Sequence, residues 1–179
     1  MEQQDIILVD EQDREIGVAG KMEVHQKGQL HRAFSVFIFD SGGRLLLQKR
    51  ALDKYHSPGL WTNTCCSHPR PGEKTEEAAA RRLREEMGFE TPLTEIFHFT
   101  YRASFENGLV EHEYDHVFAG EYEGPVNPAP EEASEYTYLH LYKINKMLQD
   151  NPDQFTPWFN IAFPRVEQWW SHHYRHLLV

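Results

Sequence analysis

Two short segments of the chain carry the side-chain types that a metal-assisted proton-transfer site requires. In the first, Cys66 stands two residues before His68, so a thiol and an imidazole lie close together. In the second, Glu111 and Glu113 are two residues apart, which places both carboxylates on one face of a strand. Imidazole and carboxylate groups bind divalent cations, and thiols and carboxylates can exchange protons. We therefore expect these segments to combine a metal with proton transfer.

The size and composition of the chain are those of one globular domain. With 179 residues, of which 40% are hydrophobic, it can bury a substantial core, and we expect a single domain over residues 1–179. It has no run of about eighteen apolar residues, so no membrane span is predicted. The polar N-terminus does not resemble a signal peptide, and two adjacent cysteines suggest no disulfide framework. These features favour a reducing, cytoplasmic location.

The formal net charge of −10 argues against a nucleic-acid-binding protein, because 28 acidic side chains outnumber 18 basic ones. The same excess would repel an anionic small molecule. A phosphorylated substrate would therefore need a local group of basic side chains or a bound cation.

Hydrophobic periodicity and turn signals predict a mixed α/β or α+β domain. We expect strands at residues 6–9, 16–19, 33–39, 44–50, 95–103 and 110–121. A helix is expected between Thr75, as its N-cap, and Gly88. Further helices are predicted at residues 141–149 and 158–178, with Pro164 bending or interrupting the second. Residues 26–30 and 125–130 are expected to be loops.

The predicted helix that starts near Thr75 resembles the Nudix box, a loop–helix–loop that holds a divalent cation against a diphosphate. The residues that fall at box positions are Glu73, Arg81, Leu83, Glu85, Glu86, Gly88 and Phe89. Two positions depart from the pattern: Ser67 occupies the position of the first glycine of the box, and Arg82 occupies the position of a glutamate. The resemblance implies a Nudix-type fold, a mixed sheet between helices. The positive side chain of Arg82, in place of a metal-binding glutamate, favours diphosphate binding over hydrolysis. The alternative is that this segment is an ordinary solvated helix with salt pairs on its surface.

With this helix placed, the chain resembles the type 1 isopentenyl-diphosphate Δ-isomerases from about residue 5 to residue 158. The resemblance rests on the pattern Thr-Asn-x-x-Cys-x-His-Pro at residues 62–69 and on Glu111-His112-Glu113 after Tyr101-Arg102. Such enzymes of isoprenoid biosynthesis convert isopentenyl diphosphate to dimethylallyl diphosphate without hydrolysing the diphosphate.

The resemblance implies roles for four of the residues. Cys66 and Glu113 match the thiol and carboxylate that exchange protons with the substrate from opposite sides. Tyr101 matches a tyrosine beside that carboxylate, and Trp158 a tryptophan whose ring faces the carbocation. On a strand, Cys65 and Cys66 would point to opposite faces, and Cys65 is expected to be a small buried hydrophobic residue. Without the resemblance, Trp158 would be read as an ordinary core aromatic.

Two metal sites and a diphosphate pocket are also implied by the resemblance. A Zn²⁺ or Mn²⁺ ion would be bound by His25, His31, His68, Glu111 and Glu113. A Mg²⁺ ion would be held by Glu86 and the backbone carbonyl of Cys66. The diphosphate and the rest of the substrate would be bound by Lys21, Arg50, Lys54, Ser67, Arg82 and Trp158. His112 is expected on the opposite strand face, away from the metal.

Two alternatives stay open. One is a Nudix hydrolase that cleaves a nucleoside diphosphate or another diphosphate. Arg82, Ser67 and the thiol segment argue against it. The other is a catalytically silent Nudix-like binding module, which would have no need to retain Cys66, His68, Tyr101 and Glu113 together. We expect a monomer or weak dimer, and the aromatic C-terminal segment, residues 169–179, to pack on the core or to form a lid or dimer contact.

Overall fold

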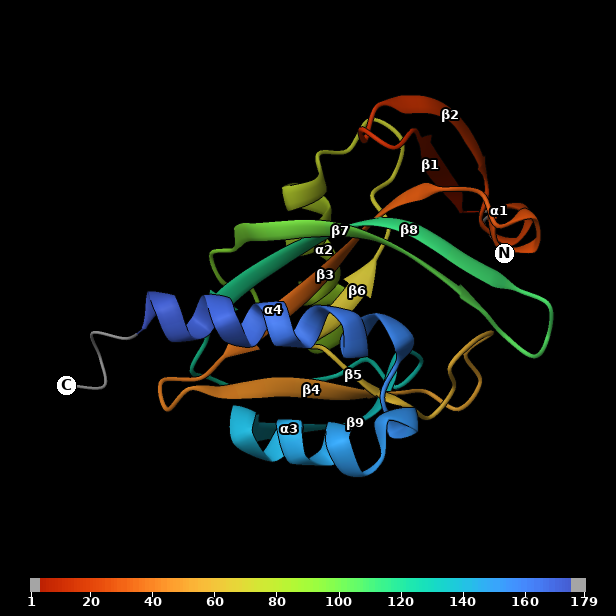
Figure 1. Ribbon diagram of the computed structural model, residues 1–179. Coiled ribbons are helices and arrows are strands. Elements are labelled where there is room, and N and C mark those ends of the chain that lie inside the picture. The colour runs from red at the N-terminus through yellow and green to blue at the C-terminus, as the bar shows by residue number, and fades with distance from the viewer. Residues whose placement is uncertain (1–3, 175–179) are drawn as a thin grey trace.

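The computed structural model describes residues 4–174, which form a nine-stranded sheet with helices against it (Figure 1). This confirms the mixed class that the sequence predicted. In chain order the elements are β1 (Asp5–Val9), β2 (Glu15–Gly20), α1 (Lys21–Lys27), β3 (His31–Phe39), β4 (Arg44–Arg50), β5 (Trp61–Thr62), β6 (Cys65–Ser67), α2 (Thr75–Met87), β7 (Thr94–Ser104), β8 (Val110–Glu121), β9 (Ala133–His140), α3 (Leu141–Asp150), η1 (Pro152–Gln154) and α4 (Pro157–His173).

Strand β3 lies at the centre of the sheet and has more partners than any other described strand. It pairs in parallel with β8 and antiparallel with β1, β4 and β6. Strand β7 extends the sheet beyond β8, and β9 extends it beyond β4, both antiparallel. The sheet is therefore mixed, and the parallel pair β3–β8 joins segments that are far apart in the sequence.

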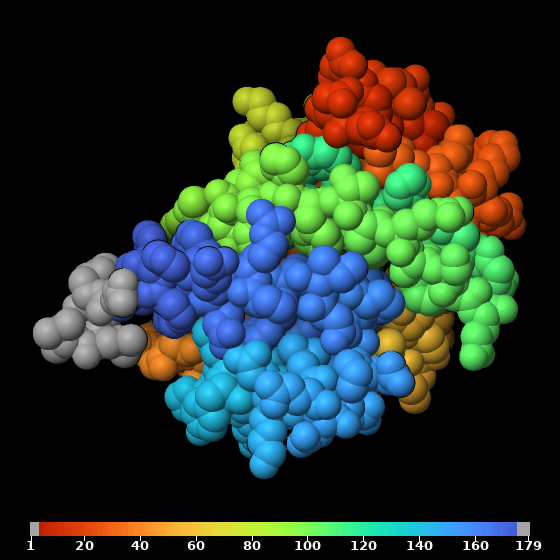
Figure 2. Space-filling model, viewed as in Figure 1, coloured from red at the N-terminus to blue at the C-terminus, as the bar shows by residue number. Residues whose placement is uncertain are grey.

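The side chains of β3 alternate between two apolar layers. Phe34, Val36 and Ile38 pack against α2 on one face. Phe37 and Phe39 pack against α4 on the other face. A strand covered on both sides reads as a nearly continuous apolar run, and β3 does so. The sheet thus lies between helices, and α4 crosses in front of it in Figure 1. In the same orientation, α3 and α4 cover much of the visible face (Figure 2).

Helix α2 begins one residue earlier than the sequence predicted. Lys74 has the extended conformation of an N-cap, and Thr75 is the first helical residue rather than the cap. No side chain caps the N-terminus, so the predicted capping role of Thr75 is wrong. Gly88 ends the helix as expected, because its φ of 79° is the left-handed conformation that glycine adopts readily.

Three other local predictions differ from the structure. The predicted loop at residues 26–30 begins inside α1, which was not predicted. Strands β5, β6 and β9 were also missed. Helix α4 continues through Pro164, so the proline does not interrupt it. Residues 175–179, which include the end of the last predicted helix and of the aromatic C-terminal segment, lie outside the described residues.

Candidate active site

Strand pairing brings Glu111, Glu113 and Tyr101 to the face of the sheet that also carries His31. In the parallel pair, His31 lies beside Glu113, and in the antiparallel pair Tyr101 lies opposite Glu113. Because side chains alternate along a strand, Glu111 shares the face of Glu113, while His112 lies on the other face. There, His112 Nδ1 is 3.1 Å from the carbonyl oxygen of Gly28.

The two neighbouring cysteines lie on opposite faces of β6. Cys66 pairs with Ser35, which belongs to the face of Glu113, whereas Cys65 pairs with Val36. Cys65 is accordingly buried in the apolar cluster beneath α2. Burial raises the pKa of the Cys66 thiol well above its usual range, so the thiol is protonated at neutral pH. The strand alternation therefore selects Cys66 as the thiol that faces the site.

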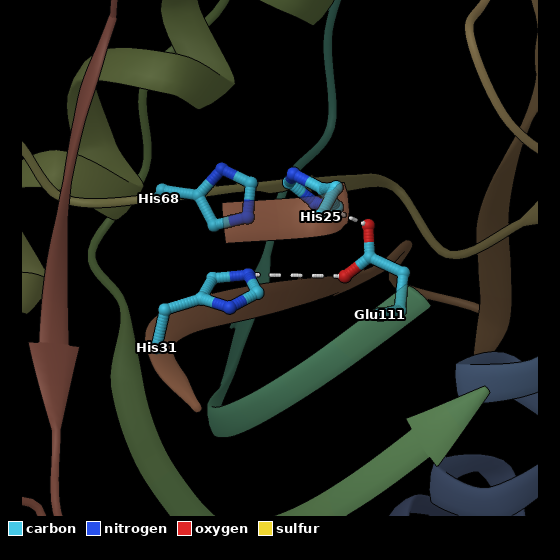
Figure 3. A group of neighbouring side chains, drawn as sticks. All are labelled: His25, His31, His68 and Glu111. Atoms are coloured by element: carbon cyan, nitrogen blue, oxygen red, sulfur yellow. Dashed lines mark hydrogen bonds and ion pairs between the residues drawn. The ribbon is translucent and has the colours of Figure 1, made fainter. Parts of the chain in front are cut away.

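Three imidazoles and a carboxylate converge on one point, as Figure 3 shows. His25 comes from α1, His31 from the start of β3, His68 from the loop after β6, and Glu111 from β8. One donor atom from each of them lies within 4.8 Å of the other three, and all four side chains are buried. Glu113 lies beside this group, because its Oε2 is 3.0 Å from His68 Nε2 and 3.5 Å from His31 Nε2.

The donor atoms fit a single transition-metal ion. Metal–ligand bonds of about 2.0–2.2 Å separate two donor atoms on opposite sides of a cation by roughly 4 Å. Donor atoms that all lie within 4.8 Å of one another are compatible with this separation. Nitrogen and carboxylate oxygen are ligands that Zn²⁺ and Mn²⁺ accept. Two buried atoms of the group, His31 Nε2 and Glu111 Oε2, have no hydrogen-bond partner. Buried polar atoms are rarely left unpaired, and a cation between them would satisfy both.

The protonation of His68 and Glu113 suits cation binding. Burial lowers the pKa of His68 to about 4, so its imidazole is neutral and its Nε2 can act as a ligand. Burial and the charge of Glu111 raise the pKa of Glu113, but contacts with His31 and His68 outweigh them and leave it below the usual value. The Tyr101 hydroxyl donates a hydrogen bond to Glu113 Oε1.

A cavity of about 140 Å³ connects this cluster to a group of basic side chains. Its lining includes Cys66, Glu113 and every side chain that the sequence assigned to substrate binding: Lys21, Arg50, Lys54, Ser67, Arg82 and Trp158. Glu86, the predicted Mg²⁺ ligand, lines it as well, and its buried Oε2 has no hydrogen-bond partner. Glu111 and His68 line the cavity, whereas His25 and His31 do not.

Acidic residues hold part of this basic group in place. Glu132 forms ion pairs with Lys54 and with Arg82, the latter at 3.0 Å. The pKa of Arg82 is raised above its usual value, because the charges of Glu86 and Glu132 outweigh the lowering effect of burial. The guanidinium therefore stays charged. Burial also lowers the pKa of Lys21. The guanidinium of Arg50 lies 5.4 Å from the centroid of the Trp158 ring, whose Nε1 donates to Asn63 Oδ1 at 3.0 Å.

Several side chains at the site were not identified from the sequence: Gln4, Tyr55, His56, Asp115 and Glu132. Asp115 had a usable signal, because it continues the spacing of Glu111 and Glu113 along one strand face. His56 and Glu132 lie in irregular segments, where spacing does not reveal which way a side chain points. Across residues 4–174, no helix is both long and apolar enough to cross a membrane.

Solved structures share the fold at low sequence identity. A crystal structure of a Deinococcus radiodurans protein matches with a TM-score of 0.76 and 18% identity, over 90% of this chain and 98% of that one. A MutT protein from Methanosarcina mazei matches with a TM-score of 0.65 and 21% identity, over 78% and 94%. These likenesses establish the fold and nothing about the reaction.

Sequence relatives are much closer. The NUDIX domain family matches residues 29–159. Isopentenyl-diphosphate Delta-isomerase 2 of Photorhabdus laumondii is 50% identical over 169 residues, covering 92% of this chain and 96% of the relative. Isopentenyl-diphosphate Delta-isomerase 1 of Aromatoleum aromaticum is 54% identical over 161 residues, covering 90% and 91%. With half of the aligned residues shared over nine tenths of its length, this chain belongs to the isopentenyl-diphosphate Δ-isomerase family of Nudix-fold proteins.

Proposed function

We propose that this pocket converts isopentenyl diphosphate to dimethylallyl diphosphate, the isomerisation that supplies isoprenoid biosynthesis. The observation that carries the proposal is that one cavity is lined by a thiol, a carboxylate and a set of basic side chains. The reaction adds a proton to the terminal methylene carbon of the alkene and removes a different proton from C2. It needs a proton donor, a proton acceptor and a diphosphate site, and this cavity supplies residue types for all three.

Cys66 and Glu113 are the groups that exchange protons with the substrate. Protonation of an unactivated alkene gives a tertiary carbocation, so the donor and acceptor must already be in place when the charge forms. Positioned acid and base groups typically contribute about 10²–10⁴-fold each. The Cys66 thiol carries a proton, whereas contacts with His31 and His68 favour the ionised form of Glu113. Tyr101 orients this carboxylate through the hydrogen bond that it donates.

Trp158 stabilises the carbocation through the face of its ring. It lines the cavity, is only 3% exposed, and is fixed by its hydrogen bond to Asn63. A cation over an aromatic ring in a desolvated site gains about 2 kcal/mol or more. The ring therefore favours the charged intermediate over the neutral substrate, which is the differential binding that accelerates a reaction.

His25, His31, His68, Glu111 and Glu113 would hold a Zn²⁺ or Mn²⁺ ion, and Glu86 with the Cys66 carbonyl would hold Mg²⁺. When bound, these ions supply positive charge that orients carboxylates and offsets the charge of the diphosphate. Lys21, Arg50, Lys54 and Arg82 bind the diphosphate oxygens beside them, and Ser67 contributes a hydroxyl. This local positive charge compensates for the acidic character of the whole chain.

We further propose a cytoplasmic enzyme that acts as a monomer or weak dimer and does not bind nucleic acid. The evidence for the last point is the net charge of −10.

The proposal is tested by incubating the protein with isopentenyl diphosphate and Mg²⁺ plus Mn²⁺, and then measuring dimethylallyl diphosphate and released phosphate. We expect the isomer without phosphate release. Phosphate without isomer would identify a hydrolase, and the absence of both products would indicate a binding module.

A further inference from the structure

The segment between β4 and β5, residues 51–60, carries two ring side chains to the metal-ligand cluster. Tyr55 places its hydroxyl 3.4 Å from Nε2 of His25. His56 places its Nε2 2.6 Å from Oε1 of Glu111, and both side chains of this pair are at most 4% exposed. His56 is a fourth histidine at the site, beyond the three that the sequence assigned to the metal.

His56 is not one of the four residues whose donor atoms converge. The atoms within 4.8 Å of one another belong to His25, His31, His68 and Glu111. His56 meets Glu111 at Oε1, whereas Oε2 has no hydrogen-bond partner. Oε1 also lies 3.0 Å from His25 Nε2. The carboxylate thus has one oxygen in contact with two imidazoles and one, Oε2, available to a cation.

The orientation of the His56 ring is fixed from several directions. The ring stacks on Phe105, with centroids 4.9 Å apart and planes at 11°, and it meets Trp158 edge-on at 5.8 Å. Arg50 donates a hydrogen bond to the backbone carbonyl of His56 at 3.1 Å. The preceding carbonyl, that of Tyr55, accepts a hydrogen bond from Asn107 at 2.9 Å. The tip of the β7–β8 hairpin therefore holds this segment against the cluster.

We propose that His56 is a positioning residue that donates a hydrogen bond from Nε2 to Oε1 of Glu111 and so presents Oε2 to the metal. This inference rests on the metal site proposed above. A neutral imidazole carries one N–H, and the 2.6 Å contact places it on Nε2. Partners that orient a metal ligand from outside typically contribute about 10–100-fold to metal affinity. An imidazole that only filled space would not need to aim a nitrogen at a buried carboxylate.

The inference is tested with variants that differ in where they place a donor. His56→Gln can set its amide near the position of Nε2, His56→Asn reaches only the position of Nδ1, and His56→Leu has no donor. Leu52→Gln is the matched control, because Leu52 lies in the same segment and is 80% exposed. Zn²⁺ affinity is measured by competition with a chromogenic chelator, and the thermal midpoint of each metal-free protein is recorded alongside.

We expect His56→Leu and His56→Asn to bind Zn²⁺ about 10–100-fold more weakly than the wild type, with His56→Gln within about threefold of it. Equal Zn²⁺ affinity in all variants would overturn the inference. It would also be overturned by a Gln variant as weak as Asn, or by a Leu variant that lowers only the metal-free midpoint. If the Leu variant does not fold, the Gln and Asn pair decides. A wild type that binds Zn²⁺ but forms no isomer would reject the proposed function and leave this inference intact.

Discussion

At the scale of single residues, Glu113 joins the two halves of the site. Its Oε1 accepts a hydrogen bond from the Tyr101 hydroxyl. Its Oε2 lies 3.0 Å from Nε2 of His68 and 3.5 Å from Nε2 of His31. One carboxylate therefore touches both the cluster that fits a metal and the cavity that contains Cys66. This shared position explains why proton exchange and metal binding should depend on each other.

If Trp158 stabilises the carbocation, kcat should fall more when its replacement has no aromatic ring than when it has a smaller one. Trp158→Leu removes the π face, and a loss of about 2 kcal/mol corresponds to a kcat lower by about 30-fold or more. Trp158→Phe keeps a smaller π face but loses the bond to Asn63, so its kcat should fall less. Steady-state kinetics on both variants provide the measurement. If the leucine and phenylalanine variants had the same kcat, the ring would have no role in stabilising the cation.

Asp115 predicts a pH dependence of stability. Its Oδ2 accepts a hydrogen bond from the Ser35 hydroxyl at 2.8 Å, and its Oδ1 has no hydrogen-bond partner. Burial and the nearby charge of Glu113 raise the pKa of Asp115 well above the usual range. The folded protein thus binds a proton that the unfolded chain releases above about pH 4. Between about pH 4 and the raised pKa of folded Asp115, the free energy of unfolding must therefore fall by about 1.4 kcal/mol per pH unit.

Asp115→Asn keeps an acceptor for Ser35 and cannot ionise. Without metal, the variant and the wild type should have similar free energies of unfolding near pH 4. As pH rises, the variant should become increasingly more stable than the wild type. Urea unfolding at several pH values measures this difference, with the exposed Asp53→Asn as control. A difference that stays constant with pH would mean that Asp115 is ionised in the folded state.

Sequence reasoning placed residues in regular segments better than residues in loops. The two-residue period predicted that Glu111 and Glu113 share a face and that Cys65 and Cys66 do not, and the pairing of β8 and β6 agrees. His56 had no such signal, because the side chains of an irregular segment follow no period. Its contact with Glu111 depends on tertiary packing against Phe105 and Trp158.

At the scale of elements, α2 links the apolar core to the diphosphate pocket. Its inward face buries Leu83 and Met87, while Arg82 and Glu86 from the same helix line the cavity. Helical spacing made this element and its function predictable. By contrast, α1 has only seven residues, too few for a clear helical period. The burial of β9 shows no regular alternation, so the two-residue period could not reveal it.

The anchoring of α2 predicts a large cost for Leu83→Ala. Leu83 is fully buried, so the substitution should lower the free energy of unfolding by about 2–5 kcal/mol. Arg84→Ala, one residue further along, removes only an exposed ion pair with Glu90 and should cost about 0–1 kcal/mol. Denaturant unfolding compares the two variants. Similar costs for both would contradict the packing of α2 described here.

At the scale of the whole molecule, an acidic chain concentrates basic side chains where the proposed substrate carries its charge. The net charge of −10 is offset locally by Lys21, Arg50, Lys54 and Arg82 around one cavity. These residues come from α1, β4, the segment after β4, and α2. No local sequence window contains this arrangement, so only the fold, or the family resemblance, could reveal it.

Metal removal should affect stability as well as activity. A cation that binds only the folded protein adds about 2.7 kcal/mol of stability when its free concentration is a hundred times its Kd. Chelated protein should therefore unfold at lower temperature and lose isomerase activity, and Zn²⁺ or Mn²⁺ should restore both. Calorimetry and product assays before and after dialysis test this. Unchanged melting and turnover after verified metal removal would refute the metal site.

The central claim is that Cys66 and Glu113 exchange solvent-derived protons with the substrate. Its most direct test is incubation with isopentenyl diphosphate in D₂O, followed by NMR of the product. The wild type should give dimethylallyl diphosphate with deuterium in a methyl group, while folded Cys66→Ala and Glu113→Gln should show at least a 10²-fold lower rate. Product formed at near wild-type rate by either variant, or product without deuterium, would contradict the account.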